Sequence, residues 1–312
     1  MMGYTRPRRG ARRIPQHRNV NIIIILFRGT IVILAIATFL APFVFYLKLQ
    51  KLEKASTCEW VANPPLVCAH GGHTSRAFPN TIGAYQHAIE ANVDCIEVDV
   101  SRSADGVLFA LHDRELQHRT GNKSLTVGSL LASEIRKLGL QVHGSGLPFK
   151  DRMVPKIEDA ITLISGAVQQ VIIDVKIGPP LYDKGLAYDI LSIIEETKCR
   201  NCLIWGKDDN LAQEVLKINP QALVGYVVMV EKNGTVSDLG RIEGASVVGV
   251  YHRLINDKLV RNLRGENTRV YAWTVDDEHS MRNLLGEAVD GIVTNKPILL
   301  KKVMNDAKMN CQ

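Results

Sequence analysis

Paired cysteine motifs are nearly absent from this chain of 312 residues. Its six cysteines are Cys58, Cys68, Cys95, Cys199, Cys202 and Cys311, and Cys199 and Cys202 form a lone C-x-x-C. A structural zinc site normally uses two such pairs, so a zinc centre is not indicated. The flanking residues also lack a thioredoxin-like context for redox chemistry. In an oxidising compartment these two cysteines would form a local disulfide, and elsewhere all six would be small buried apolar residues.

Acidic residues are missing from the first 19 residues, which contain six arginines. The formal net charge of +6 therefore resides in this segment, and the rest of the chain is close to neutral. A neutral domain lacks the basic surface that nucleic acids require, so nucleic-acid binding is not indicated. A basic arm of this kind would instead contact the anionic headgroups of membrane lipids.

Charge is also missing from the apolar stretch over residues 20–47, in which Arg28 is the one charged residue. A helix needs ~20 apolar residues to cross a bilayer, so this pattern predicts an N-terminal transmembrane helix. The alternatives are a buried core helix and a cleaved signal peptide, but no convincing small-x-small cleavage site follows. Residues 1–19 are then a basic arm, 48–63 a stalk and 64–312 the catalytic domain.

The positive-inside rule orients this predicted membrane helix, because more basic residues precede it than follow it. We expect a single-pass membrane protein with a cytosolic N-terminus and a lumenal or extracellular catalytic domain. The sequons at Asn122 and Asn233 fit such a location, because N-glycosylation occurs in the secretory pathway.

From Leu66 onward, short β-rich runs alternate with amphipathic helical patterns. The expected strands are 66–70, 94–100, 107–111, 171–176, 202–205, 223–228, 246–250, 269–274 and 290–294. The expected helices are 80–91, 127–138, 156–164, 182–197, 210–218, 257–264 and 277–286. This alternation predicts a parallel sheet, and about eight β/α units in ~245 residues are typical of a (β/α)₈ TIM barrel. A doubly wound open sheet is the alternative, but no G-x-G-x-x-G follows its first strand.

Two carboxylates share one face of the strand expected at 94–100. Glu97 and Asp99 are two residues apart, so their side chains point the same way. Burying two like charges is costly unless a cation lies between them, and oxygen ligands favour Mg²⁺ or Ca²⁺. A salt bridge with Lys176 or with an arginine is the alternative. His70 and His112 follow two other short apolar runs, so three strand ends bring histidines and carboxylates together.

A series of short motifs then resembles the glycerophosphodiester phosphodiesterase family. Its H-R-G, P-E-N-T, E-x-D-V, D-G and H-D motifs have counterparts here at His70–Gly72, Phe78–Thr81, Glu97–Val100, Asp105–Gly106 and His112–Asp113. Its E-x-K, W-T-V and D-G-I-x-T-D-x-P motifs have counterparts at Asp174–Lys176, Trp273–Val275 and Asp290–Pro297. The resemblance covers about residues 66–300. It implies a metal-dependent barrel enzyme that cleaves glycerophosphodiesters to glycerol 3-phosphate and an alcohol.

The resemblance also implies a role for each matching residue. His70 and His112 would be the general base and general acid, and imidazole suits both roles because its pKa lies near neutral pH. Glu97, Asp99 and Asp174 would bind the divalent cation, Mg²⁺ or Ca²⁺. Lys176 would pair with the phosphate. Trp273 would form an apolar wall for the substrate, or else pack within the barrel.

Departures of the chain from the family pattern affect charged residues of the motifs. Gly71 replaces the arginine of H-R-G, Pro79 replaces the glutamate of P-E-N-T, and Asp174 is one methylene shorter than the family's glutamate. Arg76, in the same loop, would then supply the missing cation to the substrate. The leading hypothesis is hydrolysis of glycerophosphocholine-like diesters. The alternatives are a lysophospholipase D acting on lysophospholipids, and a catalytically weak barrel with a binding role.

Overall fold

The structure, a computed structural model, describes residues 27–28, 36, 38, 40, 42–46, 48, 58–75, 77–141, 148–230, 234–236 and 238–311. The chain divides into two compact units, Met1–Ala55 and Ser56–Gln312. All strands of the described residues belong to the second unit.

The expected single-pass membrane protein is contradicted by the structure. Crossing a bilayer takes ~20 apolar residues in one helix, and no helix of the described residues is long and apolar enough. The predicted localisation, with a cytosolic N-terminus and a lumenal or extracellular domain, is therefore corrected. Most of the predicted transmembrane stretch 20–47 and the first part of the predicted stalk lie outside the described residues.

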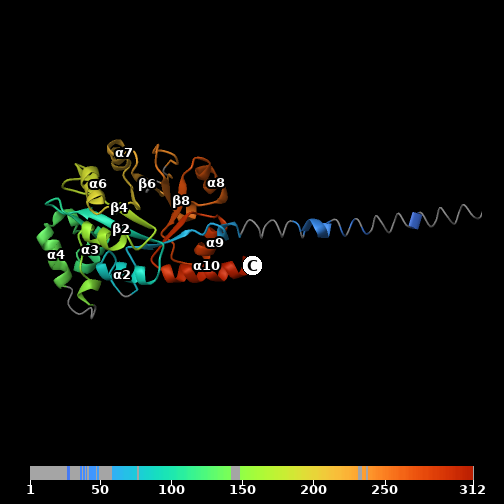
Figure 1. Cartoon of the computed structure of the whole chain (residues 1–312), viewed down its shortest axis with the longest axis horizontal. Helices are drawn as coiled ribbons and strands as arrows, with labels where there is room; N and C mark the ends of the chain where they lie inside the picture. Colours follow the sequence, from blue (N-terminus) through green and yellow to red (C-terminus); the bar gives the residue numbers. More distant parts are fainter. Residues whose placement is uncertain are drawn as a thin grey trace, which may run out of the picture. The chain divides into compact units, whose positions relative to one another are not determined.

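Parallel strands form a closed barrel in the second unit (Figure 1). The strands are β1 (Leu66–His70), β2 (Cys95–Arg102), β3 (Leu108–Ala110), β4 (Gln170–Val175), β5 (Cys202–Gly206), β6 (Leu223–Val228), β7 (Val247–Tyr251), β8 (Arg269–Trp273) and β9 (Gly291–Thr294). Pairing runs in parallel from β1 through β9, β8, β7, β6, β5 and β4 to β2, and the β1–β2 pair closes the ring. Strand β3 pairs antiparallel with β2 and stays outside the ring.

Helices surround the barrel on its outer side (Figure 1). They are α2 (Ile82–Glu90), α3 (Asp113–Thr120), α4 (Ala132–Gln141), α5 (Ile157–Ile164), α6 (Leu186–Glu196), α7 (Asp209–Ile218), α8 (Asp257–Gly265), α9 (Glu278–Gly286) and α10 (Pro297–Cys311). The TIM-barrel prediction is confirmed for this unit. The prediction succeeded because strands and helices alternate along the sequence as they do in such a barrel.

Side chains that cap the helices mark where several of them begin. Thr81 accepts from the backbone N–H of Ala84 at the start of α2, and Asp208 accepts from Leu211 at the start of α7. Asn256 and Asp277 do the same for α8 and α9. Each cap satisfies an N–H that has no partner within the helix.

The alternation of side chains along each strand produces two packed layers. The inner layer consists of strand residues: Cys68, Cys95, Ile172, Leu203, Trp205, Val227, Val247, Tyr271 and Val293. The outer layer combines strand residues such as Val98 with helix residues such as Ile161 and Ile190. Because the period is two, residues that follow Cys68, Cys95 and Ile172 at even spacing also point inward.

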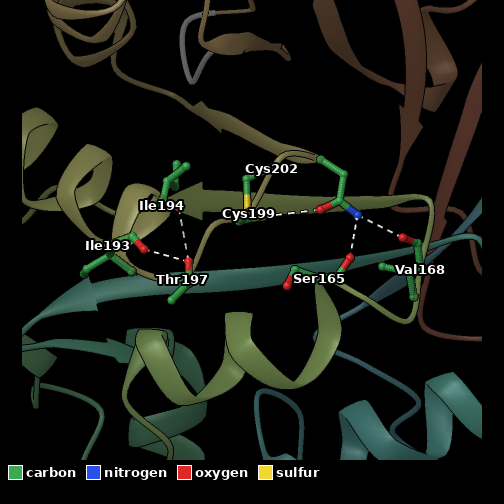
Figure 2. The surroundings of a disulfide bond; sticks show 8 residues. Ser165, Val168, Ile193, Ile194, Thr197, Cys199 and Cys202 are labelled. Carbon is green, nitrogen blue, oxygen red and sulfur yellow. Dashed lines mark hydrogen bonds between the residues drawn. A yellow bond between two sulfur atoms is a disulfide. The ribbon is translucent and has the colours of Figure 1, made fainter.

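Two disulfides join cysteines of the second unit. Cys199 pairs with Cys202, as the lone C-x-x-C allowed (Figure 2). The side-chain amide of Asn201 donates to the carbonyls of Ser165 and Val168. Cys58 pairs with Cys311, 253 positions away, and no sequence pattern predicted this pair. Cys68 and Cys95 are buried and reduced inside the barrel.

The observed helices differ from the expected ones in several places. The pattern over 127–138 divides into a 3₁₀ turn, Val127–Ser129, and helix α4, with Leu130 in an extended conformation between them. The turn brings Gly128 against the loop after β4, where a Cβ would lie 1.8 Å from the carbonyl oxygen of Pro179. Helices α3 and α10 were not expected at all.

Candidate active site

Three neighbouring strands bring carboxylates and a histidine to one end of the barrel. Glu97 and Asp99 follow Cys95 on the inward face of β2, His70 follows Cys68 on β1, and Asp174 follows Ile172 on β4. The register pairs His70 with Glu97 and Asp99 with Asp174. Glu97 and Asp99 are almost wholly buried. All four lie toward the carboxyl ends of the strands, which is where barrel enzymes carry their active sites.

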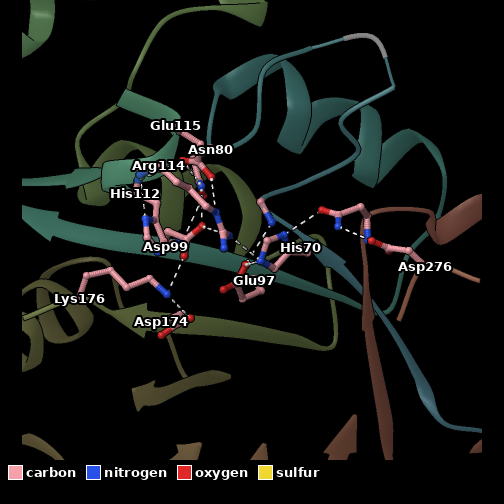
Figure 3. A network of polar contacts seen from close by, with 12 residues as sticks. His70, Asn80, Glu97, Asp99, His112, Arg114, Glu115, Asp174, Lys176 and Asp276 are labelled. Atoms are coloured by element: carbon pink, nitrogen blue, oxygen red, sulfur yellow. Dashed lines mark hydrogen bonds and ion pairs between the residues drawn. The ribbon is translucent and has the colours of Figure 1, made fainter. Parts of the chain in front are cut away.

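Lys176 neutralises part of this charge. Its Nζ lies 2.8 Å from Oδ1 of Asp99 and also donates to Oδ2 of Asp174 (Figure 3). Burial would raise the pKa of Asp99, but Lys176 and the two histidines outweigh it and hold that pKa well below its usual range. Burial opposes the charged form of Lys176 too, yet the three carboxylates raise its pKa. The Lys176 ammonium and the Asp99 carboxylate are therefore both charged at neutral pH.

Glu97 carries negative charge that is less well compensated. Burial raises its pKa well above the usual value, and the charges of Asp99 and Asp174 add to the rise. The N–H of Gly71 donates to Glu97 Oε2 at 3.1 Å and offsets only part of this. Ligand atoms of His70, Glu97 and Asp99 lie within 4.8 Å of one another. Carboxylate oxygens with such excess charge fit a hard divalent cation.

His70 is held in one tautomer by a residue at the end of β9. Asn295 donates from Nδ2 to Oδ2 of Asp276 at 2.7 Å, which turns its Oδ1 toward His70. Nδ1 of His70 lies 2.9 Å from that oxygen and must carry the proton of this hydrogen bond. Burial lowers the pKa of His70 from its usual 6.5. The ring is thus neutral at pH 7, with the lone pair on Nε2.

His112 adopts the opposite tautomer because it caps helix α3. Its Nδ1 accepts the backbone N–H of Arg114 at 3.1 Å, and Glu115 accepts the N–H of His112 to complete a capping box. The proton of the neutral ring is therefore on Nε2. Burial lowers the pKa of His112 to about 4. The two histidines offer one lone pair and one N–H.

A buried amide supports this arrangement from the loop before α2. Asn80 donates from Nδ2 to Asp99 Oδ2 at 2.9 Å and to Glu115 Oε2 at 3.0 Å. Its Oδ1 accepts from the hydroxyl of Tyr85 and from the N–H of Asp99. Burial raises the pKa of Glu115 to about 7, and the charge of Asp99 adds to the rise. Asn80 therefore fixes Asp99 and links it to helix α3.

A cavity of about 760 Å³ opens beside His70. Helix α3 contributes Arg114 and Arg119 to its wall, and the loop after β1 contributes Phe78 and Pro79. The guanidinium of Arg119 stacks 4.8 Å from the centre of the Phe78 ring. The cavity is large enough for a small organic ligand and reaches His70, whose Nε2 carries the lone pair.

Comparison with known proteins identifies the family. The sequence model of the glycerophosphoryl diester phosphodiesterase family matches residues 70–299. The chain belongs to this family. It is 49% identical over 273 residues to glycerophosphodiester phosphodiesterase GDPD4 of Arabidopsis thaliana, covering 86% of this chain and 83% of the relative. It is 19% identical to lysophospholipase D GDPD1 of Rattus norvegicus, covering 76% of this chain and 85% of that one.

Solved structures with the same fold include a phosphodiesterase from Oleispira antarctica in complex with the product sn-glycerol-3-phosphate. That structure superimposes with a TM-score of 0.64 at 18% identity, over 78% of this chain and 97% of the other. A glycerophosphodiester phosphodiesterase from Agrobacterium tumefaciens gives a TM-score of 0.61 at 23% identity, over 76% and 99%. Both confirm the barrel fold.

Two departures from the family's motifs turn out to be neighbours. Gly71, in place of arginine, has a φ of +62°, and a Cβ there would lie 3.0 Å from Cβ of Pro79, which replaces glutamate. The basic and the acidic residue of the family pattern are therefore absent from two adjacent positions. The loop between them contains Arg76, whose predicted role lies outside the described residues.

Trp273 is the last residue of β8, and the centre of its ring lies 6.0 Å from the centre of the Tyr251 ring. The cavity wall includes the next residue, Thr274, rather than Trp273. Its predicted contact with substrate stays a prediction.

Sequence reasoning missed Arg114, Asn80, Glu115, Asn295 and Asp276. Asn80 and Asn295 lie within the motifs at Phe78–Thr81 and Asp290–Pro297, and those motifs were the available signal.

Proposed function

We propose that this chain hydrolyses glycerophosphodiesters to sn-glycerol 3-phosphate and an alcohol, and that residues 64–312 form its catalytic domain. One observation carries the proposal: two histidines in opposite tautomers flank a buried carboxylate cluster in a barrel of this family. The name of the Arabidopsis relative and the product in the Oleispira structure support the same reaction.

In this proposal His70 is the general base and His112 the general acid. The lone pair on His70 Nε2 accepts the proton of the attacking hydroxyl. The phosphorus–oxygen bond to the leaving alcohol breaks, and His112, doubly protonated when the anionic phosphate is bound, gives its Nε2 proton to that oxygen and becomes neutral. Asn295 supports the first role by holding the other His70 proton on Nδ1. The capping contact of His112, in which Nδ1 accepts, belongs to its neutral form.

The attacking hydroxyl belongs either to the glycerol moiety or to water. Attack by the glycerol hydroxyl produces a cyclic phosphate, which water opens in a second step with the histidine roles reversed. Attack by water gives glycerol 3-phosphate directly. Detection of a cyclic glycerol phosphate during turnover would distinguish the first route from the second.

Glu97 and Asp99, with Asp174 as a third carboxylate, are the residues that would hold Mg²⁺ or Ca²⁺. When bound, such a cation offsets the negative charge that develops on the phosphoryl oxygens. Lys176 holds Asp99 and Asp174 in place, since its ammonium contacts both. Its predicted contact with phosphate would require it to leave these two carboxylates.

The direct test incubates the full-length protein with glycerophosphocholine and measures release of sn-glycerol 3-phosphate. Parallel reactions contain Ca²⁺, Mg²⁺ or EDTA, and His112→Ala serves as the blank. We expect release that requires a divalent cation and is absent from the blank. If neither cation supports release, glycerophosphocholine is not a substrate.

Hydrolysis of lysophospholipids is the second candidate. The cavity beside His70 has Ala77, Phe78 and Pro79 in its wall, and these apolar side chains would contact an acyl chain. The same assay with lysophosphatidylcholine would then release choline and leave lysophosphatidic acid. Inactivity towards both classes of substrate would favour a catalytically weak barrel with a binding role.

A further inference from the structure

Arg114 reaches over the active site from the first turn of helix α3 (Figure 3). Its Nη2 lies 3.0 Å from Nε2 of His70. Its distances to the carboxylate oxygens are longer, 3.8 Å to Asp99 and 3.9 Å to Glu115. The side chain is 54% exposed and lies in the wall of the cavity. The guanidinium therefore donates a hydrogen bond to a neutral imidazole and makes only loose ion pairs.

The other cation of the centre is bound differently. Lys176 is 23% exposed, and its ammonium contacts both Asp99 and Asp174 at hydrogen-bonding distance. Moving it to a ligand would leave Asp99, a buried carboxylate, without its cation, which is costly. Arg114 can turn away without such a loss, because the imidazole of His70, to which it donates, is uncharged. Of the two, Arg114 is the cation available to an incoming anion.

Arg114 can also supply the positive charge that is missing because Gly71 replaces the arginine of the H-R-G motif. Gly71 and Pro79 are adjacent, so the loop after β1 contributes neither the arginine nor the glutamate of the family's motifs. A phosphodiester that enters between Glu97, Asp99 and Asp174 carries negative charge and needs a compensating donor. Arg114 approaches His70 from α3, on the other side of this loop. A guanidinium matches the geometry of phosphate with two parallel N–H donors.

We propose that Arg114 binds the phosphate of the diester and, in doing so, releases Nε2 of His70. The proposal rests on the proposed function. While its N–H occupies the His70 lone pair, that nitrogen cannot accept a proton from a nucleophile. A phosphate anion is a stronger acceptor than a neutral imidazole, so the guanidinium moves to the phosphate when substrate binds. The general base is thus uncovered by the substrate itself.

The test compares full-length wild type with Arg114→Gln and Arg114→Lys. Calorimetry measures binding of sn-glycerol 3-phosphate, with uncharged glycerol as the reference ligand and a fixed concentration of divalent cation. Loss of a charge-assisted pair predicts about 10- to 100-fold weaker binding of glycerol 3-phosphate to Arg114→Gln, and lysine should restore part of it. The KM of Arg114→Gln for a diester should rise as its affinity for glycerol 3-phosphate falls.

Arg261→Gln is the matched control, because Arg261 is also an exposed arginine but pairs with Asp257 on helix α8. It should bind glycerol 3-phosphate as wild type does. Thermal unfolding of each variant excludes loss of fold as the cause of weaker binding.

A structural role for Arg114 would give a different pattern. If it only balances the charge of Asp99, Arg114→Gln will change the affinity for the divalent cation and leave glycerol 3-phosphate binding within about twofold, which would overturn the proposal. Failure of wild type to hydrolyse any diester would count against the proposed function instead. Even if wild type hydrolyses no diester, comparing glycerol 3-phosphate binding by wild type and Arg114→Gln still decides the role of Arg114.

Discussion

Asn295 accepts a hydrogen bond from Nδ1 of His70 at 2.9 Å, although the two residues are 225 positions apart. The contact crosses from β9 to β1, the strands that pair where the chain returns to its beginning. Asp276 holds Asn295 in this orientation, because its Oδ1 accepts the backbone N–H of Asn295 and its Oδ2 accepts from the side-chain Nδ2. The tautomer of the His70 ring is thus set by residues from the C-terminal part of the barrel.

Replacing Asn295 should impair catalysis without removing a catalytic group. Asn295→Ala lets His70 rotate and change tautomer, so we expect kcat to fall about tenfold or more while KM changes little. Steady-state kinetics on the best diester would measure this. Asn201→Ala is the control, since Asn201 also bonds through its amide but lies by the Cys199–Cys202 disulfide. Equal kcat in wild type and Asn295→Ala would remove Asn295 from this role.

Removing either histidine should abolish turnover. We expect His70→Ala and His112→Ala each to lower kcat by ~10²–10⁴-fold, the usual contribution of a general acid or base. His279→Ala, an exposed histidine on α9, should retain full activity. Circular dichroism would verify that the fold persists. Near-parental activity in either site variant would show that the assigned acid–base mechanism is wrong.

Glu97→Gln should weaken binding of the divalent cation. The substitution keeps the size of the side chain and removes the charge that attracts the ion, so excess metal should partly restore activity. Activity measured against the concentration of Ca²⁺ or Mg²⁺ gives the apparent affinity. Glu214→Gln, on the distant helix α7, is the matched control. An unchanged metal dependence would exclude Glu97 from the ligand set.

Glu115 should make stability depend on pH. Burial raises its pKa to about 7 in the folded chain, against 4.5 for an unperturbed glutamate. Between these values the folded state keeps a proton that the unfolded state loses, so the free energy of unfolding falls as pH rises from about 4.5 to about 7. The shift corresponds to a loss of ~3 kcal/mol.

Glu115→Gln isolates this contribution, because an amide oxygen can accept the same bonds from Asn80 and His112. In EDTA, denaturant titrations should give the variant a larger free energy of unfolding than wild type at pH 8, and an equal one near pH 4. A difference that stays constant across this range would contradict the raised pKa.

Much of the barrel could be predicted because each strand is a short apolar run with a clear end. All nine expected strands are found, most within one or two residues of the expected bounds. Helix α3 was missed because its sequence is mostly polar and Leu116 is its one buried apolar residue. Its start depends on a capping box in which histidine takes the place usually held by serine or threonine.

The site was predictable only as far as strand ends reveal it. His70, Glu97, Asp99 and Asp174 follow apolar runs directly, so their convergence follows from a parallel barrel. Arg114 and Glu115 lie within helix α3, and the sequence does not show which face of this helix is directed toward the active site. The predicted single-pass localisation is contradicted, since no helix of the described residues is long and apolar enough to cross a bilayer.

The Cys58–Cys311 disulfide makes the barrel unit a covalent loop, since it joins residues near the two ends of that unit. A protease that cuts one surface loop between them therefore opens a ring and releases no fragment. The nicked protein would migrate as two pieces only after reduction. Because this disulfide joins the two ends of the unit, new termini could be introduced in an exposed loop while the original ends stay covalently linked.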